Sequence, residues 1–445
     1  MEIGLMVLKA FVREHMTWAL PIWRTIYNVR NQFIGRRRLK EAAAVQENLE
    51  HVVSALQKCD GPIRVGFYVF NESVFPLESL FQLMVHDKQF SPSVVVTCDR
   101  EYNDSEGSKS RLAIHRRTVQ SLNEKYPGSV LDSLKDMCAI DYSEQFDVCA
   151  VSYPYEAYAH PYCQISFLAK HRKLVIYTDY GTYTGCVQVS GYLHMSVFAY
   201  LWRYYAGVAE MGKRIEKAHP CLAEHHRIVV SGSPKISAFA QKLQKKHLRK
   251  IVIIAPHHTI CETELFHISN FVQYSDFIAR LPKRYPMIDW VFRPHPNLLP
   301  KMVDLGYWTQ DQCDAYIRNW ESQPNAKYQI GGAYYATLVN SDGLIQDCAS
   351  FLAEYFATGH PQCYMLKSPE HEKLQYAGLG LEMLEHVYRA YSEKDIIQYI
   401  EEVVLKGHDP MQKARERFAK EKLLINYPHA SEFILNDIKH ALGRV

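Results

Sequence analysis

The sequence lacks several patterns that mark common nucleotide-binding and hydrolytic folds. It has no GxGxxG after a first strand, no GxxxxGK[ST] loop and no GxSxG segment, which argues against a dinucleotide-binding domain, a P-loop enzyme and a serine hydrolase. Its eleven cysteines form no CxxC pair, and no cleavable signal peptide is evident. We therefore expect free thiols in a reducing cytoplasm.

A large charge excess and a long apolar run are also missing. The formal net charge of +3 is too small to indicate a nucleic-acid-binding protein. Residues 1–40 contain eight Lys/Arg against two Glu, with Trp18 and Trp23 among them, but no stretch approaches the ~20 apolar residues of a membrane span. Two interpretations stay open for this segment: a helix lying on the inner, anionic face of the cell membrane, or one packed on protein.

The length of 445 residues exceeds what one core usually holds, so we expect two main domains. Strand-like runs alternate with helical ones in both halves, which predicts two doubly wound parallel sheets of the α/β class. Tyr200 to His226 is expected to cross between the domains. The predicted organisation is a helical extension over 1–60, an acceptor domain over 61–205, a donor domain over 226–400, and helices that cross back over 401–445.

Polar side chains follow the predicted strands of the first half. The segments after these strands are Asn71 to Ser73, Tyr153 to Glu156 and Thr178 to Thr182. Ligands of open α/β sheets bind beyond the carboxyl ends of strands, and Tyr with carboxylate suits an acceptor that bears hydroxyl groups. Three carboxylates are candidate general bases: Glu72, Glu156 and Asp179.

Cations, imidazoles and hydroxyls follow the predicted strands of the second half. Four segments share this property: SGSPK (231–235), APHHT (255–259), RPHP (293–296) and the stretch from Asp342 to Ser350, of which the first follows a strand expected at 227–230. Loops at one sheet edge converge, so we predict an anion site there. The spacing of the histidines argues against zinc. The predicted donor-binding residues are Ser233, Lys235, His257, His258, Arg293, Ser341, Asp342, Asp347, Ser350 and Glu354.

These motifs, in this order, resemble the glycerophosphotransferase family of teichoic-acid and capsule synthesis. The resemblance covers about residues 60–420 and includes SDGLIQDCASFLAEYFATGHP (341–361). It implies a GT-B fold, with two facing Rossmann-like domains, and a cytidine-diphosphate donor whose pyrophosphate faces Ser350 and His295. The family's His-Gly pair, proposed to supply its base, falls on Tyr180-Gly181, and its double serine on Ala349-Ser350. Tyr, with a pKa near ~10, is a poor base at neutral pH.

The expected function is transfer of a polyol-phosphate from a CDP-linked donor to a lipid-linked or oligosaccharide acceptor, without a cofactor. Two alternatives stay open: a glycosyltransferase that uses a nucleotide-sugar, and a catalytically silent partner in a capsule assembly complex. The expected catalytic residues are His295, Asp179, Tyr180 and Glu72.

Overall fold

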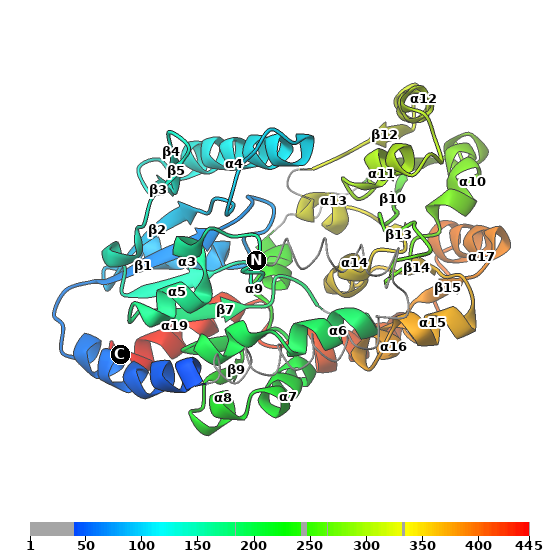
Figure 1. Ribbon diagram of the computed structural model, residues 1–445. Helices are drawn as coiled ribbons and strands as arrows, with labels where there is room; N and C mark the ends of the chain where they lie inside the picture. The colour runs from blue at the N-terminus through cyan, green and yellow to red at the C-terminus, as the bar shows by residue number, and fades with distance from the viewer. Residues whose placement is uncertain (1–39, 183, 242–246, 265, 332–333, 445) are drawn as a thin grey trace, which may run out of the picture.

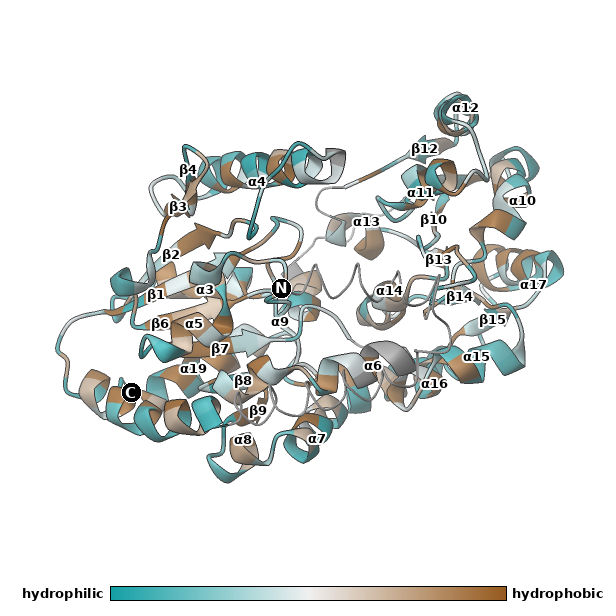
Figure 2. Ribbon diagram, in the orientation of Figure 1, coloured by the Kyte–Doolittle hydropathy of each residue, from teal (hydrophilic) through white to brown (hydrophobic). Residues whose placement is uncertain are grey.

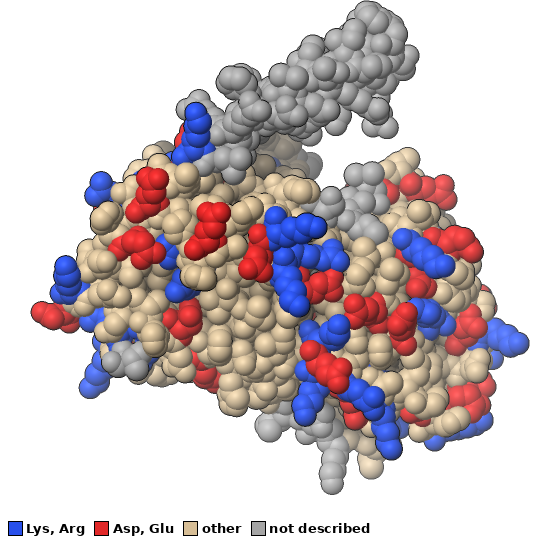
Figure 3. Space-filling model, turned by 90° about the horizontal axis from the view of Figure 1, so that it is seen from below, with Lys and Arg blue, Asp and Glu red and all other residues tan. Residues whose placement is uncertain are grey.

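The computed structural model describes residues 40–444 except 183, 242–246, 265 and 332–333. The basic segment predicted to contact a membrane or pack on protein therefore lies outside the described residues. Two parallel sheets, each with its own helices, form two lobes (Figure 1). Within the described residues no helix is both long enough and apolar enough to span a bilayer. On the face shown in Figure 3, basic and acidic side chains are interspersed.

The first sheet has seven parallel strands in the order β3-β2-β1-β6-β7-β8-β9. Its central strand β1 is buried along most of its length, as expected for a sheet covered on both faces, and Figure 2 shows apolar strands between helices with polar outer sides. Gly66 in β1 faces Phe146, whose ring lies 2.5 Å from where a Cβ would stand. The strands are β1 (Ile63–Val69), β2 (Phe90–Val96), β3 (Val130–Asp132), β6 (Val148–Val151), β7 (Leu174–Thr178), β8 (Arg203–Ala206) and β9 (Ile228–Val230).

The second sheet has six parallel strands in the order β12-β11-β10-β13-β14-β15. In both sheets the strand order reverses beside the first strand, between β1 and β6 and between β10 and β13. This is the Rossmann order, and ligands bind at the point where the order reverses, the switch point. The strands are β10 (Lys250–Ala255), β11 (Ile288–Phe292), β12 (Ala326–Tyr328), β13 (Gly343–Gln346), β14 (Gln362–Met365) and β15 (Tyr388–Ala390). A separate hairpin pairs β4 (Leu134–Lys135) with β5 (Cys138–Ala139).

Helices cover both sheets. Residues 40–57 are helical. The first lobe has α3 (Glu78–Val85), α4 (Glu106–Lys125), α5 (Ile165–Lys170), α6 (Cys186–Leu193), α7 (Ala209–Ala218), α8 (Pro220–Glu224) and α9 (Pro234–Ser237). The second has α10 (Phe271–Arg284), α11 (Leu298–Asp304), α12 (Gln310–Glu321), α13 (Tyr335–Val339), α14 (Ala349–Glu354), α15 (Pro369–Gln375), α16 (Leu379–Leu384) and α17 (Glu393–Gln398), followed by α18 (Gln412–Phe418) and α19 (Ala430–Ala441).

The strand at 228–230 does not open the second sheet, contrary to the expectation from sequence. It pairs with β8 and closes the first sheet. The segment from Tyr200 to His226, expected as a crossing between domains, contributes β8 and two helices to the first lobe. The sequence pattern does indicate the strand at 228–230, but a run of three apolar residues does not show which strand it pairs with.

The last helix returns to the first lobe. In α19, Ile434 and Ile438 belong to the core of the first sheet. Ser431 Oγ lies 2.6 Å from Ser79 Oγ, and Lys439 lies 2.6 Å from Asp87. In Figure 1 this red helix lies beside the blue and green elements of the first lobe.

Candidate functional site

Three histidines meet at the switch point of the second sheet. His257 and His258 follow β10, and His295 follows the neighbouring strand β11. The ring centroids of His258 and His295 are 4.0 Å apart, and those of His257 and His258 are 4.3 Å apart. One nitrogen from each ring lies within 4.8 Å of the others. This histidine cluster is compact enough for its rings to share one bound group, either an anion or a metal ion.

The three rings are uncharged at neutral pH. Burial, together with the charge of Lys301, lowers the pKa of His258 to about 4. Burial, His258 and Lys301 lower the pKa of His295 to about 3. Burial and the neighbouring imidazoles also hold the pKa of His257 well below its usual value. Neutral imidazoles can each donate one hydrogen bond and accept one.

Backbone contacts indicate which ring nitrogen carries the hydrogen. The N–H of Asn297 donates to Nδ1 of His295 over 3.1 Å. Nδ1 of His257 lies 3.4 Å from the backbone nitrogen of Thr259 and 2.9 Å from the Thr259 hydroxyl, which can donate to it or accept from it. In a neutral ring whose Nδ1 accepts, Nε2 holds the hydrogen and acts as a donor. Nδ1 of His258 is buried without a hydrogen-bond partner among the described residues.

Asp347 fixes the loop that carries two of these rings. Its carboxylate is fully buried and accepts the N–H of His257 and the N–H of Asn270, each over 2.6 Å. Burial raises the pKa of Asp347 to about 7. Both oxygens are therefore engaged by backbone, and Asp347 positions the loop rather than facing the cleft.

A second group of charges joins the two lobes. Lys235 Nζ, on α9, lies 2.7 Å from Glu354 Oε1 on α14 and donates to the carbonyl oxygen of Tyr180 over 3.2 Å. The Tyr334 hydroxyl donates to Glu354 Oε2 over 2.6 Å. Arg293 lies over the Tyr334 ring at 5.5 Å from its centroid, and burial lowers the pKa of the Arg293 guanidinium.

The predicted serine and aspartate ligands do not all lie at the carboxyl ends of strands. Ser350 lies in the first turn of α14, after the carboxyl end of β13, and its Oγ is 3.2 Å from Cys348 Sγ. Ser233 caps α9 through the N–H of Ile236. Ser341 and Asp342 precede β13 and so lie at its opposite end, where Asp342 contacts Lys250 at 2.9 Å. A polar segment that precedes a strand looks like a polar segment that follows one in the sequence. The sequence pattern therefore did not distinguish Ser341 and Asp342 from Ser350.

Two of the three candidate bases serve structural contacts in the first lobe. Asp179 is buried after β7 and accepts hydrogen bonds from the Tyr192 hydroxyl, from the Tyr204 hydroxyl over 2.8 Å and from the N–H of Gly207 over 3.1 Å. Burial raises the pKa of Asp179 to about 6. Glu156 Oε1 accepts the N–H of Ser166 over 2.7 Å.

Glu72 is placed differently. It lines a cavity of about 430 Å³ between the lobes, together with residues of α3, α4, α9 and α13 that include Lys235 and Tyr334. Glu72 Oε2 is buried and has no hydrogen-bond partner among the described residues. A carboxylate that lines a cavity and has an oxygen without a partner has capacity to accept a proton or a hydrogen bond from a ligand.

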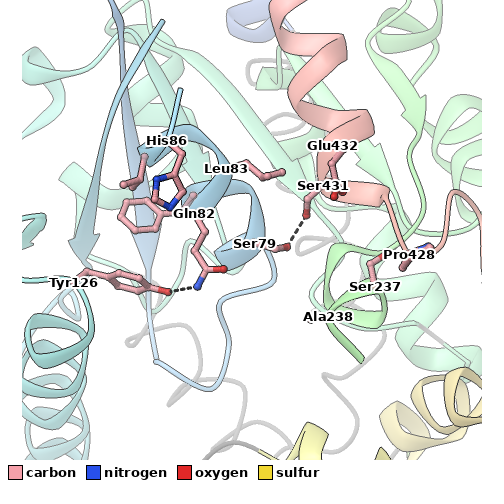
Figure 4. Close-up of a pocket in the computed structure, with 12 residues that line it drawn as sticks. Ser79, Gln82, Leu83, His86, Tyr126, Ser237, Ala238, Pro428, Ser431 and Glu432 are labelled. Atoms are coloured by element: carbon pink, nitrogen blue, oxygen red, sulfur yellow. Dashed lines mark hydrogen bonds between the residues drawn. The ribbon is translucent and has the colours of Figure 1, made fainter. Parts of the chain in front are cut away.

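A neighbouring cavity continues from this one. It also measures about 430 Å³ and shares Ser79, Gln82 and Ala238 with the first cavity. Figure 4 shows its walls: Gln82 donates to the Tyr126 hydroxyl over 2.9 Å, and Ser79 meets Ser431 of α19. The two cavities therefore follow one another along α3 as far as α19.

Sequence reasoning missed Tyr334 and Lys301. Tyr334 precedes α13 and connects Glu354 with Arg293, whereas Lys301 lies in α11 and lowers the pKa of the histidines. Neither follows a strand directly. The expectation that ligands bind beyond the carboxyl ends of strands therefore did not indicate these two residues.

Comparison with known proteins identifies the fold. No family model matches the chain, and no curated protein matches its sequence. Among solved structures, a UDP-N-acetylglucosamine 2-epimerase superposes with a TM-score of 0.55 at 12% identity, over 87% of this chain and 98% of the other. The wall teichoic acid polymerase TagF gives a TM-score of 0.55 at 12% identity, over 95% and 97%. The UDP-GlcNAc 2-epimerase of Neisseria meningitidis gives a TM-score of 0.51 at 14% identity, over 85% and 100%. The chain has the GT-B fold of two facing Rossmann-like domains.

Proposed function

We propose that this protein is a transferase that moves a polyol-phosphate from a CDP-linked donor to an acceptor hydroxyl in cell-surface polysaccharide synthesis. The observation that carries the proposal is the histidine cluster at the switch point of the second sheet. His295 has Nδ1 as an acceptor, which leaves its Nε2–H as a donor, and Lys301, paired with Glu264, lies close enough to lower the pKa of this ring. N–H donors beside a cation favour an anion such as a pyrophosphate over a metal ion.

The chemistry assigned to the site is a phosphoryl transfer. The acceptor oxygen forms a bond to the phosphorus of the polyol-phosphate, and the bond from that phosphorus to the bridging oxygen breaks, so the electron pair leaves with CMP. The histidine cluster and Arg293 offset the charge that develops on the leaving phosphate. Nε2–H of His295 is the donor placed for this role, and the absence of a metal requirement follows as a prediction.

Glu72 is the general base of this proposal, and it takes the proton from the acceptor hydroxyl. Glu72 lines the cavity between the lobes, and its Oε2 has no hydrogen-bond partner among the described residues. Asp179 has its oxygens engaged by two tyrosines and a backbone N–H, so it supports the loop that carries Tyr180. Proton transfer by a positioned base contributes about 10²- to 10⁴-fold to rate.

Sugar transfer from a UDP-linked donor is the second candidate. It is favoured by fold neighbours whose structures hold UDP or UDP-GlcNAc, whereas a TagF structure soaked with CDPG favours the first candidate. The products separate them, because polyol-phosphate transfer releases CMP and sugar transfer releases UDP. A silent partner in a capsule assembly complex, suggested by Tyr180 at the family's histidine position, would bind nucleotide and release neither.

Thermal-shift titration with CMP, CDP, UDP and GDP tests the donor site. A ligand at about 100 times its Kd adds about 2.7 kcal/mol to the free energy of unfolding, which raises Tm by about 3 °C or more. We expect cytidine nucleotides to stabilise the protein, and His295→Ala to remove the effect. His408→Ala, at an exposed histidine of the same lobe, is the matched control. Selective stabilisation by UDP or GDP would replace the first candidate with the second.

Glu72→Gln tests the assignment of the base. We expect turnover to fall by about 10²- to 10⁴-fold with the nucleotide affinity unchanged. Glu78→Gln is the control, because Glu78 lines the same cavity but lies 2.6 Å from Lys125 Nζ. Equal loss in both variants would show that cavity structure, and not a proton acceptor at Glu72, limits the reaction.

A further inference from the structure

An aromatic surface lies at the carboxyl ends of three adjacent strands in the first lobe. Phe70 follows β1, Tyr153 and Tyr155 follow β6, and Tyr180 follows β7. The Phe70 and Tyr153 rings are stacked at 5.1 Å, and Tyr153 lies 4.7 Å from Tyr155 and 6.0 Å from Tyr180. All four side chains are partly exposed. We call this group the aromatic wall.

The wall adjoins the contact between the lobes through Tyr180. The carbonyl oxygen of Tyr180 accepts from Lys235, which lies 2.7 Å from Glu354 of the second lobe. Phe70 is two residues before Glu72, which lines the cavity between the lobes. A ligand resting on the wall would thus have one edge near the carboxylate assigned as the base. β1 and β6 also flank the switch point of their sheet, where ligands of this architecture bind.

We infer that the aromatic wall is the acceptor subsite and that it holds a neutral sugar ring. The inference rests on the proposed function and names its acceptor. A pyranose ring has a flat face of C–H groups that packs on an aromatic ring, and hydroxyls at its rim. The Tyr155 and Tyr180 hydroxyls are 3.5 Å apart, so both can bond to such a rim. Partly exposed aromatic rings with a polar edge are typical of ligand sites.

The charges around the wall distinguish between acceptors. The strand ends that carry it also carry the carboxylates Glu72 and Glu156, whereas Asp179 is buried and Lys235 is balanced by Glu354. A chain of polyol-phosphate units has a negative charge on every unit and no flat apolar face, so it packs poorly on the rings and meets like charge at Glu72 and Glu156. A neutral glycan terminus meets neither penalty. The protein therefore adds the first polyol-phosphate to a sugar, and the reaction that supplies its acceptor is a glycosyl transfer.

Ligand-detected NMR on the full-length protein tests this inference. The probes are N,N′-diacetylchitobiose, a neutral disaccharide, and glycerol 3-phosphate, an anionic acyclic polyol. We expect saturation transfer to the disaccharide, an affinity at least about fivefold lower in Tyr155→Ala and Tyr180→Ala, and retention of most of it in Tyr155→Phe. The control is Tyr158→Ala, at a tyrosine of the same loop that is 62% exposed.

The outcomes separate this inference from the proposed function. CMP stabilisation is measured in each variant, and its retention shows that the donor lobe is intact. CMP binding with no disaccharide binding, or with tighter binding of glycerol 3-phosphate, overturns the aromatic wall as a sugar site. Disaccharide binding that depends on Tyr155 and Tyr180, without any nucleotide binding, supports the wall and overturns the proposed donor chemistry. An equal loss in Tyr158→Ala also refutes the assignment.

Discussion

The buried carboxyl of Asp347 gives the protein a pH-dependent stability that one substitution removes. In an unfolded chain the pKa of Asp is about 3.9, whereas burial raises the pKa of Asp347 to about 7. Between these values the folded state binds more protons than the unfolded state, so the contribution of this group to the free energy of unfolding falls as pH rises. From pH 5 to pH 8 the fall is about 3 kcal/mol, because one pKa unit corresponds to about 1.4 kcal/mol.

Asp347→Asn isolates this contribution. The amide keeps one acceptor oxygen, but its NH₂ meets the second backbone donor, so the variant is less stable by about 1–3 kcal/mol at pH 5. Asn does not titrate, so the advantage of the wild type shrinks by about 3 kcal/mol by pH 8. Denaturant unfolding, followed by tryptophan fluorescence at pH 5, 6, 7 and 8, measures the free energy of unfolding of both proteins. In the difference between the two values the contributions of the other titrating groups cancel.

The control is a buried asparagine of the same lobe that does not contact Asp347. Asn325 donates through its side chain to the carbonyl oxygens of Pro282 over 3.0 Å and Ile288 over 2.9 Å. Asn325→Ala is expected to destabilise the protein by an amount that does not change with pH. A constant difference between wild type and Asp347→Asn, or one that grows with pH, would refute the reasoning from burial.

Three further predictions concern other contacts. Asp179→Asn places an amide NH₂ against hydroxyl and N–H donors, so it should lower the free energy of unfolding by about 1–3 kcal/mol in urea while CMP still stabilises the variant. Gly232→Ala should lower Tm far more than Gly306→Ala, because both have positive φ but only the Cβ at 232 would meet a backbone oxygen, at 1.9 Å. Zn²⁺ should raise Tm less than CMP does; a larger rise, abolished by His295→Ala, would show instead that the histidine cluster binds metal.

The sequence allowed the site in the second lobe to be located in outline. His257, His258 and His295 follow strands that were recognised, and adjacent parallel strands bring such residues together. The two doubly wound sheets follow from the alternation of strands and helices, and the GT-B fold, which the family resemblance implied, is confirmed. Motif spacing alone could not have shown which carboxylate oxygens lack a hydrogen-bond partner. Asp347 and Glu72 both follow strands, and only their packing in three dimensions distinguishes them.

What the sequence could not supply depends on contacts between distant segments. The approach of Lys235 to Glu354 and Tyr180 joins three separate stretches of the chain. The strand at 228–230 joins the first sheet because β8 offers it an open edge, a fact that its own three residues do not encode. The aromatic wall likewise arises only when the ends of β1, β6 and β7 become neighbours.

The return of α19 to the first lobe affects how the protein is made. The core of the first sheet, whose strands lie between residues 63 and 230, is completed by Ile434, Ile438 and Leu442. During synthesis this apolar face of the amino-terminal lobe stays uncovered until residues 430–442 have left the ribosome. A fragment cut between the two sheets would keep the same face bare, so the halves are not separable folding units.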